Sequence, residues 1–206
     1  MFRKEYNETT VVQGNKVQTL ENCKALAFTG HTNIEKCYGI EQIPEKYNPE
    51  AFESCYLDIK NFIDNYINQN PNDKITIITG MARGVDEIAG LVAMDKGLSL
   101  ICSVPHSVEW HKNRANTSKG RVQAIFYDKF IEYSRASWVE IKKSYSGGHQ
   151  FANFARNCFM VDIATDVVSF KQYDSTGTDH CIKYAKSEGK YIGNIKATGK
   201  EEQWQN

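Results

Sequence analysis

The stretch Lys74–Pro105, KITIITGMARGVDEIAGLVAMDKGLSLICSVP, decides the fold. Its first six residues are almost all β-branched and stop at Gly80, which predicts a buried strand followed by a turn. A helix is predicted over Asp86–Lys96, where Gly97 ends it, and a second strand over Leu98–Val104. A strand, a helix and a strand in this order indicate a βαβ unit with parallel strands.

The same alternation continues on both sides of this unit. Because the strands alternate with helices of about a dozen residues, we expect an α/β, Rossmann-like fold with a mostly parallel sheet and helices on both faces. Ligands of such sheets bind at the carboxyl ends of the strands, where the strand order reverses. The further strands are predicted at Cys23–Thr29, Asp166–Phe170 and Tyr191–Ile195, and the further helices at Pro49–Gln69, Val122–Ser134, Phe151–Val161 and Asp179–Ser187.

Length and composition favour one domain. The chain has 206 residues, 41% of them hydrophobic, which is enough to bury one sizeable core. We expect residues 22–196 to form this domain, residues 1–21 to form an N-terminal extension or edge hairpin, and residues 197–206 to form a polar tail. Within the domain, Gly30–Pro49 is interpreted as a long connection, and no element is predicted for Ser137–Gln150.

The apolar runs and the cysteines bear on the cellular location of the protein. No run approaches the roughly 18 apolar residues that a membrane span needs, and Met1–Thr10 lacks the apolar segment of a signal peptide. The six cysteines are scattered without a C-x-x-C pair, so the spacing gives no support for a zinc site. Free thiols suit a reducing compartment, and we expect a cytoplasmic protein without a membrane partner.

The charge balance bears on the partner. Lys plus Arg and Asp plus Glu both number 25, so the formal net charge is zero. Proteins that bind nucleic acid usually carry a basic excess that neutralises phosphates. The balance therefore argues against nucleic acid as the partner, although it leaves room for a local basic patch.

The first motif whose side chains could contact a ligand is Thr29-Gly30-His31, directly after the first predicted strand. Glycine lets the backbone turn sharply and approach a ligand closely. The threonine hydroxyl and the histidine ring can both donate to an anion or a base. A plain turn explains the same three residues equally well.

The second motif is the turn between the strand that ends at Thr79 and the following helix. Backbone N–H groups of such a turn and of the helix N-terminus form an anion-binding nest. The spacing Gly80-x-x-x-Gly84 is neither the G-x-G-x-x-G of a dinucleotide site nor a P-loop, so no cofactor is expected. The alternative is a solvated Arg83 and an Asp86 that merely suits the helix dipole. The candidate ligand residues here are Gly80, Met81, Arg83, Gly84, Val85 and Asp86.

The third motif is Ser175-Thr176-Gly177-Thr178, before the last predicted helix. Hydroxyl groups around a glycine at a helix N-terminus converge with backbone N–H groups, and this combination can hold a phosphate. The alternative is an ordinary Ser or Thr helix cap. The presence of two glycine-bearing strand-to-helix turns in one small α/β chain favours a phosphate site.

Taken together, these patterns resemble the SLOG superfamily. The resemblance rests on Thr29–His31, on T-G-x-A-x-G-V-D-x-x-A at Thr79–Ala89, on the hydroxyl-Gly-Thr turn at Ser175–Thr178, and on Arg156-Asn157-x-x-Met160. The chain looks most similar to the YspA/YpsA-like branch, which includes small phage and bacterial proteins. The superfamily also contains the lonely guy phosphoribohydrolases and DNA-processing protein A. The resemblance implies a Rossmann-like fold that binds a nucleotide between the two glycine turns, with Arg156 and Asn157 beside the ligand.

The chain departs from the hydrolases of this superfamily after Thr178. Those enzymes carry a catalytic glutamate soon after their phosphate loop, whereas this chain continues with Asp179, His180 and Cys181. We therefore expect a protein that senses or sequesters a nucleotide-derived signalling ligand. One alternative is a nucleoside-monophosphate N-glycosidic hydrolase, in which Arg156 anchors the substrate and Asp86 or Asp162 is the acid. A second alternative is a single-stranded DNA-binding protein, against which the neutral charge argues.

A further group of side chains follows the strand that ends at Pro105. His106, Trp110 and Arg114 could stack on a base and contact phosphate. The alternative is a surface loop anchored by the tryptophan. The five histidines are too dispersed to suggest a metal site. The aromatic residues of Pro49–Gln69 would also suit an interface in a homodimer or higher homo-oligomer.

Overall fold

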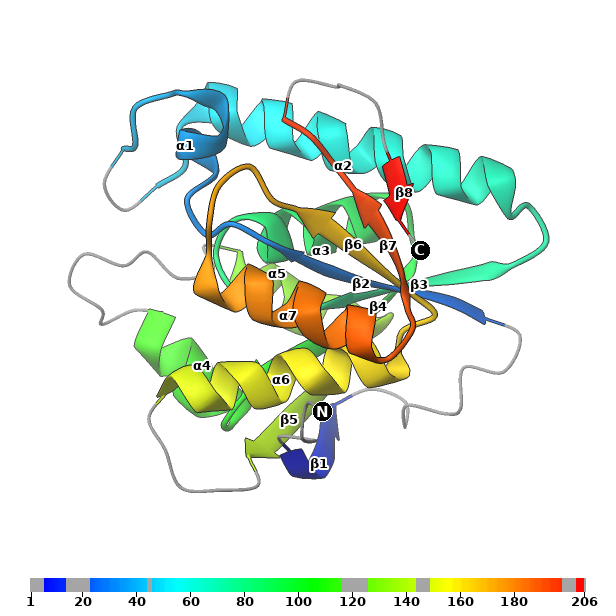
Figure 1. The fold of residues 1–206 in the computed structure, drawn as a ribbon. Helices are drawn as coiled ribbons and strands as arrows, with labels where there is room; N and C mark the ends of the chain where they lie inside the picture. The colour runs from blue at the N-terminus through cyan, green and yellow to red at the C-terminus, as the bar shows by residue number, and fades with distance from the viewer. Residues whose placement is uncertain are drawn as a thin grey trace.

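An eight-stranded sheet lies at the centre of the part of the chain that the structure describes (Figure 1). The structure, a computed structural model, describes residues 6–13, 23–43, 46–115, 126–143, 149–197 and 203–205, with the backbone alone for 6–13, 112–115, 142–143, 149–150 and 203–205. The strand order is β1-β5-β4-β3-β2-β6-β7-β8. The strands are β1 (Tyr6–Gln13), β2 (Cys23–Gly30), β3 (Lys74–Thr79), β4 (Ser99–Pro105), β5 (Ala136–Lys143), β6 (Asp166–Phe170), β7 (Tyr191–Asn194) and β8 (Gln203–Gln205).

The six inner strands, from β5 to β7, are all parallel. Only the two edge strands run against their neighbours: β1 is antiparallel to β5 and β8 to β7. The prediction of a mostly parallel Rossmann-like sheet is therefore confirmed. The edge strands fall within residues 1–21 and 197–206, where the sequence predicted an extension or hairpin and a polar tail.

Helices cover both faces of the sheet (Figure 1). In β2 the large side chains Leu26 and Phe28 join the core under α2 and α3, whereas Ala25 and Ala27 join the core under α6 and α7. Small residues on the second face allow those helices to approach the strand closely. No helix among the described residues is long and apolar enough to cross a membrane. The helices are α1 (Ile34–Tyr38), α2 (Pro49–Gln69), α3 (Val85–Asp95), α4 (Val108–Ala115), α5 (Tyr127–Glu132), α6 (His149–Ile163) and α7 (Thr176–Ser187).

The longest helix, α2, has the bounds that its sequence predicts. Asn48 caps it by accepting a hydrogen bond from the N–H of Glu50, and Pro49 occupies the first helical position. Its buried stripe includes Ile59, Phe62 and Ile63, at the steps of three and four that an amphipathic helix requires. Local signals and tertiary packing agree here, which explains why the prediction was accurate.

Other elements differ from the prediction. The connection Gly30–Pro49 contains the short helix α1, which is held by the burial of Ile34 and Glu35 rather than by any periodicity. The unassigned Ser137–Gln150 contains most of β5 and the start of α6. The predicted helix Val122–Ser134 is shorter, as α5, and its residues 122–125 lie outside the described residues. The polar stretch after Pro105 forms α4.

The last helix begins three residues earlier than predicted. Because α7 starts at Thr176, the motif Ser175–Thr178 is its N-cap and first turn instead of a separate loop. The first-turn N–H groups of the helix therefore belong to the predicted phosphate motif itself.

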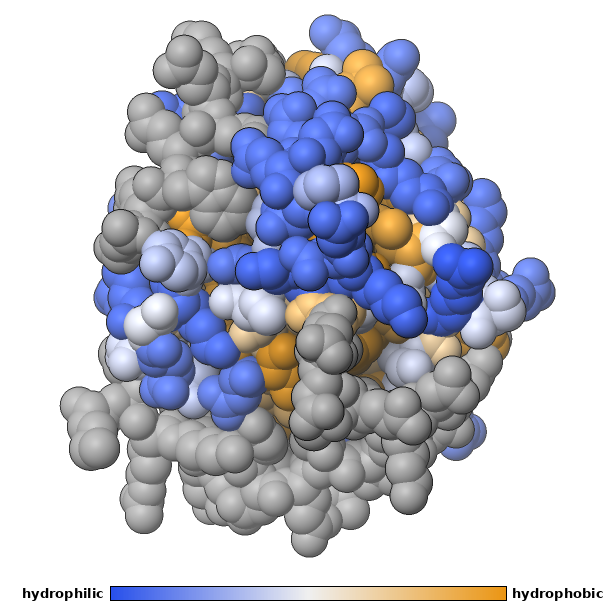
Figure 2. All heavy atoms as spheres, turned by 90° about the vertical axis from the view of Figure 1, so that its right-hand side faces the viewer, coloured by the Kyte–Doolittle hydropathy of each residue, from blue (hydrophilic) through white to orange (hydrophobic). Residues whose placement is uncertain are grey.

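The strand order reverses between β2 and β6. From β2 the chain steps through β3 and β4 to β5 on one side, and then returns to build β6 and β7 on the other side. Figure 1 shows the carboxyl ends of these strands on its left, and Figure 2 shows the opposite edge, where the described residues are mostly hydrophilic. In doubly wound sheets ligands bind at the carboxyl edge beside such a reversal. The fold thus singles out the turns after β2 and β6.

Candidate functional site

Three turns meet at the carboxyl edge of the sheet: those after β2, β3 and β6, which we call the carboxyl-edge site. Because the three strands are adjacent and parallel, their carboxyl ends lie together. Thr178 at the start of α7 donates from Oγ1 to the carbonyl of Gly30 at 3.0 Å. Asn157 of α6 donates from Nδ2 to the carbonyl of Gly177 at 3.0 Å. The three sequence motifs are therefore neighbours in space.

Two glycines allow the turns after β2 and β3 to pack backbone against backbone. A Cβ on Gly30 would lie 2.6 Å from the Cβ of Val85. Gly84 has φ +88°, and a Cβ there would overlap the carbonyl of His31. The N–H of Val85 donates to that same carbonyl at 3.1 Å. Neither glycine has room for a side chain, so both are required by close approach.

A buried ion pair lies over the turn after β3. Arg156 Nη1 donates to Asp86 Oδ2 at 3.2 Å, and each side chain is only 9% exposed. The guanidinium lies against Gly80, where a Cβ would overlap it. Burial raises the pKa of Asp86 to about 6, although Arg156 and the backbone N–H groups of Ala82 and Gly80 oppose this shift. Arg156 is thus held by Asp86 over the turn after β3.

The first turn of α7 is the most open part of the carboxyl-edge site. Ser175 is the N-cap, yet its hydroxyl makes no capping bond to the helix and lies 3.3 Å from Thr178 Oγ1. Thr176 and Gly177 are exposed, and a Cβ on Gly177 would meet nothing within 4 Å. First-turn N–H groups have no acceptor inside their own helix. The turn therefore offers donors beside free space.

His31 does not face this space as the predicted donor. Its Nε2 accepts hydrogen bonds from the backbone N–H of Gln172 at 2.9 Å and of Tyr173 at 3.2 Å. The ring is buried and stacks on the ring of Tyr173, with centroids 3.6 Å apart. Burial, followed by the charge of Lys171, lowers the pKa of His31 to about 4. The imidazole is therefore a neutral acceptor that holds the connection between β6 and α7.

Arg83 lies away from the open turn. Its Nη2 donates to Glu35 Oε1 and to the carbonyl of Lys46, both at 3.0 Å, and its guanidinium lies over the ring of Tyr47. The Arg83 and Glu35 side chains are 4% and 0% exposed. The solvated alternative for Arg83 is wrong, and its contacts anchor the α1–α2 connection rather than a ligand.

A second group of buried side chains supports the turn between β3 and α3, and the sequence analysis did not identify it. The hydroxyl of Tyr47 donates to Glu87 Oε2 and accepts from the N–H of Gly84, both at 2.6 Å. Glu87 Oε1 accepts from the N–H of Phe126 at 2.7 Å. The one available signal was the carboxylate of Glu87 within the apolar run of α3. Nothing in the sequence paired it with Tyr47, which is 40 residues away.

The remaining residues of these turns serve packing. Met81 is fully buried at φ +53°, and its N–H donates to Thr79 Oγ1 at 3.0 Å. A side chain at positive φ marks local backbone strain, which is common near functional sites. Burial raises the pKa of the Cys181 thiol of α7, and a hydrogen bond from the Thr29 side chain opposes this shift.

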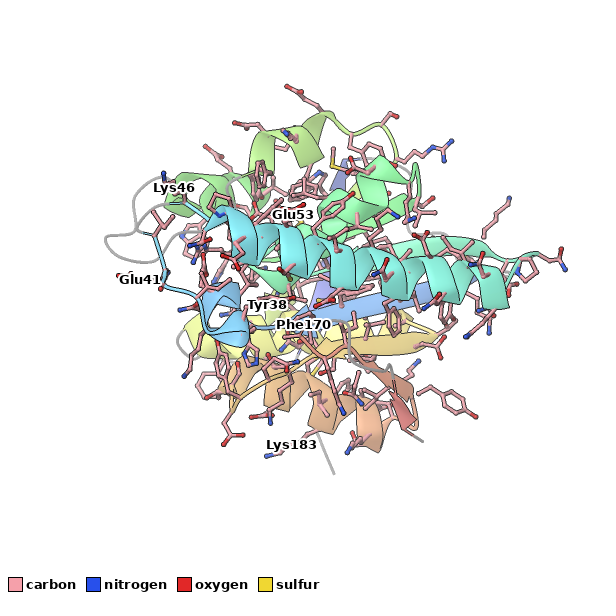
Figure 3. The ribbon with its side chains drawn as sticks, turned by 90° about the horizontal axis from the view of Figure 1, so that it is seen from above. Tyr38, Glu41, Lys46, Glu53, Phe170 and Lys183 are labelled. Atoms are coloured by element: carbon pink, nitrogen blue, oxygen red, sulfur yellow. The ribbon has the colours of Figure 1, made fainter. Side chains whose placement is uncertain are left out.

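The unpredicted helix α1 reaches the end of β6 (Figure 3). Its Tyr38 ring lies 6.2 Å from the ring of Phe170, and its hydroxyl donates to Asp58 Oδ2 at 2.7 Å. In Figure 3 both labelled rings lie near the α1 end of α2, whereas the labelled Lys183 of α7 lies on the far side of the sheet. The segment after β2 is therefore fastened to β6 as well as to α2.

Other candidates lie outside the three turns that make up the carboxyl-edge site. Asp162 lies in the last turn of α6, about 9 Å along the helix from Arg156 at the usual rise per residue, and accepts from the Tyr184 hydroxyl. His106 and Trp110 contact each other, with ring centroids 4.4 Å apart. They follow β4, which is the parallel neighbour of β3 at the same carboxyl edge and lies about 10 Å from β2 at the usual strand spacing. The side chain of Arg114 lies outside the described residues.

Comparison with known proteins identifies structural neighbours. No protein-family model matches the chain, and no curated protein matches its sequence. The structure is similar to DNA processing protein A from Streptococcus pneumoniae, with a TM-score of 0.56, 14% identity and 85% of this chain covered. The chain spans 51% of that protein. It is also similar to DNA processing protein A from Helicobacter pylori, with a TM-score of 0.52, 14% identity, and 92% of this chain and 81% of that chain covered.

These neighbours correct the expectation about nucleic acid. The Helicobacter pylori protein is described as binding single-stranded DNA. The argument from zero net charge against a nucleic-acid partner is therefore wrong, because a mean charge does not describe the local charge at one edge of a sheet. At 14% identity the likeness shows the fold alone. That fold is Rossmann-like, as the alternation of strands and helices predicted, and DNA processing protein A shares it.

Proposed function

We propose that the protein binds a nucleotide or nucleotide-derived ligand at the carboxyl-edge site and works as a sensor or sequestering protein. The observation that carries this proposal is the first turn of α7, which lies at the strand-order reversal with Thr176 and Gly177 exposed. In this proposal the ligand's phosphate binds to that turn. Within the superfamily, we assign the chain to the YspA/YpsA-like branch.

The electrostatics of the turn suit a phosphate. The N-terminus of a helix carries a partial positive charge, and its free N–H groups point at a bound anion. The carboxylate of Asp179, in the same turn, accepts from the Ser175 N–H at 3.2 Å and is paired with Lys171 at 2.5 Å. Lys171 also pairs with the exposed Asp174 at 3.3 Å, so its charge offsets part of the negative charge of these two carboxylates. The hydroxyl of Ser175 can add one further donor within the same turn, whereas the buried hydroxyl of Thr178 donates to the carbonyl of Gly30.

The pairing of the carboxylates favours binding over catalysis. Asp86 is paired with Arg156, and Asp179 is paired with Lys171. A carboxylate that protonates or stabilises a reacting glycosidic bond must reach the substrate. Asp162, the other acid considered for a hydrolase, bonds Tyr184 at the far end of α6. A hydrolase would need one of these pairs to open.

The phosphate could also belong to a nucleic-acid backbone. The observation that favours this second candidate is the fold shared with DNA processing protein A, one example of which binds single-stranded DNA. A backbone phosphate and a free nucleotide present the same oxyanion to a helix N-terminus. The two candidates differ in how many phosphates bind, and therefore in salt dependence.

Calorimetry with the full chain tests the proposal. The probes are nucleoside monophosphates, cyclic dinucleotides, ADP-ribose and a single-stranded oligothymidylate, at low and high salt. We expect saturable binding that is weakened at least about tenfold by Gly177→Asp, equivalent to about 1.4 kcal/mol. The added carboxylate meets open space and suits the helix dipole, so folding should be retained. Binding of the oligonucleotide alone, with a steep salt slope, would identify the second candidate.

The matched control is Asn72→Asp. It makes the same charge change in the exposed turn before β3, at the opposite edge of the sheet. This variant should bind like the wild type. Equal binding by the wild type and Gly177→Asp, or no binding of any probe by the wild type, would refute the phosphate site. Release of free base from a monophosphate would establish the hydrolase instead.

A further inference from the structure

We infer that His31 is the positioning residue of the phosphate site: as an acceptor for two backbone N–H groups, it fixes the connection from which α7 starts. The inference rests on the proposed function, in which the ligand's phosphate lies on the first turn of α7. It assigns His31 no contact with the ligand. The side chain acts through the backbone of residues 171–175.

The geometry concentrates two donors on one atom. The N–H groups of Gln172 and Tyr173, which are consecutive, both point at Nε2 of His31, at 2.9 and 3.2 Å. Two adjacent N–H groups can share an acceptor only if the backbone curls around it. Ser175, the N-cap of α7, follows two residues later. The backbone curl therefore sets the direction in which α7 begins, and with it the direction in which the N–H groups of its first turn point.

The ring of Tyr173 adds a second attachment to the same segment. It stacks on His31 with an interplanar angle of 11°, and its hydroxyl donates to the carbonyl of Asn33 at 3.0 Å. The Lys36 ammonium lies 4.2 Å from the centre of the Tyr173 ring. The segment after β2 thus contacts the segment after β6 across the strand-order reversal. Among these contacts, His31 accepts the two hydrogen bonds from backbone N–H groups.

Only a neutral imidazole can do this. An imidazolium carries N–H on both nitrogens, so Nε2 would then face two N–H donors and lose both bonds. The charged groups around the ring are Lys171 and Lys36, which favour the neutral form, and Asp179, which favours the charged form. Burial is the largest influence, and it holds the pKa of His31 at about 4. At neutral pH the proton therefore lies on Nδ1.

Two substitutions distinguish the contribution of the hydrogen-bond acceptor of His31 from that of its aromatic ring. In His31→Gln, the amide oxygen can accept both N–H groups, whereas His31→Phe keeps a ring that can stack on Tyr173 but has no acceptor. With the nucleotide probe that the wild type binds best, we expect affinity within about threefold for His31→Gln and at least about tenfold weaker for His31→Phe. If the two variants bind alike, the inference is overturned.

A control variant accounts for simple loss of stability. Tyr66→Phe removes a hydrogen bond from the Tyr66 hydroxyl to Asp166 Oδ2, 2.6 Å long, at the amino end of β6. It weakens the attachment of the same strand at the opposite edge. Its affinity for the probe should match that of the wild type. An equal loss of affinity in Tyr66→Phe and His31→Phe would show that only stability matters.

A measurement without ligand keeps this inference separate from the proposed function. Amide hydrogen exchange at Gln172 and Tyr173 should be slow in the wild type and His31→Gln and faster in His31→Phe. The wild-type amide resonances should shift with acid to a midpoint near the His31 pKa of about 4, and this shift should be absent in His31→Gln. If the amides behave so while no probe binds, the phosphate site fails and the role of His31 in the connection stands. Unchanged exchange in His31→Phe would refute that role.

Discussion

At the scale of single residues, two glycines of the carboxyl-edge site have opposite meanings. Gly80 lies beneath the Arg156 guanidinium, and a Cβ there would overlap it and approach Asp86 Oδ2 to 2.7 Å. Gly177, in the first turn of α7, faces open space. The sequence marked both as turn glycines. Only the packing shows that the first is required by the fold and that the second leaves room for a ligand.

We predict that Gly80→Ala destabilises the protein by about 3–5 kcal/mol, because it forces apart the buried Arg156–Asp86 pair. Gly177→Ala should change stability by less than about 1 kcal/mol. Urea unfolding of both variants measures the difference. Similar losses in the two variants would contradict this account of the site.

At the scale of elements, the turn before α3 depends on residues far away in the chain. Tyr47, just before α2, bonds both Glu87 and the N–H of Gly84, and Glu87 in turn bonds the N–H of Phe126. Two other segments, around Tyr47 and Phe126, are thereby joined to the start of α3. Because these polar groups are buried, each needs its partner.

Tyr47→Phe should therefore cost about 2–3 kcal/mol of stability, since it leaves buried polar groups short of a partner. The matched control is Tyr56→Phe, which removes an equally short bond, 2.6 Å, to Asp95 at an exposed position. That change should cost less than about 0.5 kcal/mol. Thermal and urea unfolding measure both, and equal costs would show that burial does not govern this network.

At the scale of the whole molecule, two buried groups give stability opposite dependences on pH. His31 has its folded-state pKa lowered from 6.5 to about 4, so its contribution is present above pH 6.5 and is lost as pH falls. Asp86 has its pKa raised from 3.8 to about 6, so its contribution is present below pH 3.8 and is lost as pH rises. Between these limits the two effects oppose each other.

Variants should separate the two effects. The difference in unfolding free energy between wild type and His31→Gln should shrink by at most about 3 kcal/mol as pH falls from 6.5 to 4. The difference between wild type and Asp86→Asn should grow over pH 6 to 4. Urea unfolding at half-unit steps of pH measures both, and slopes of the same sign would refute the assignment.

The sequence by itself determined the parallel sheet, the two glycine turns and helix α2, because these depend on local periodicity, caps and breakers. It could not find α1, nor the roles of Arg83 and His31. Those features depend on contacts between segments far apart in the chain, such as His31 with Gln172 and Tyr173. The prediction from zero net charge that nucleic acid is an unlikely partner was likewise wrong. The net charge does not say which charged side chains the fold brings together at the carboxyl edge of the sheet.

The sequence marked two turns by their glycines, Gly80 and Gly177, and the tertiary structure decided that the two turns have different roles. The turn around Gly80 is covered by Arg156 and closed against His31, whereas Ser175–Thr178 is the open first turn of α7. Spacing in the sequence places a glycine at the end of a strand. Whether the space above it is filled or free depends on which distant side chains the fold brings there.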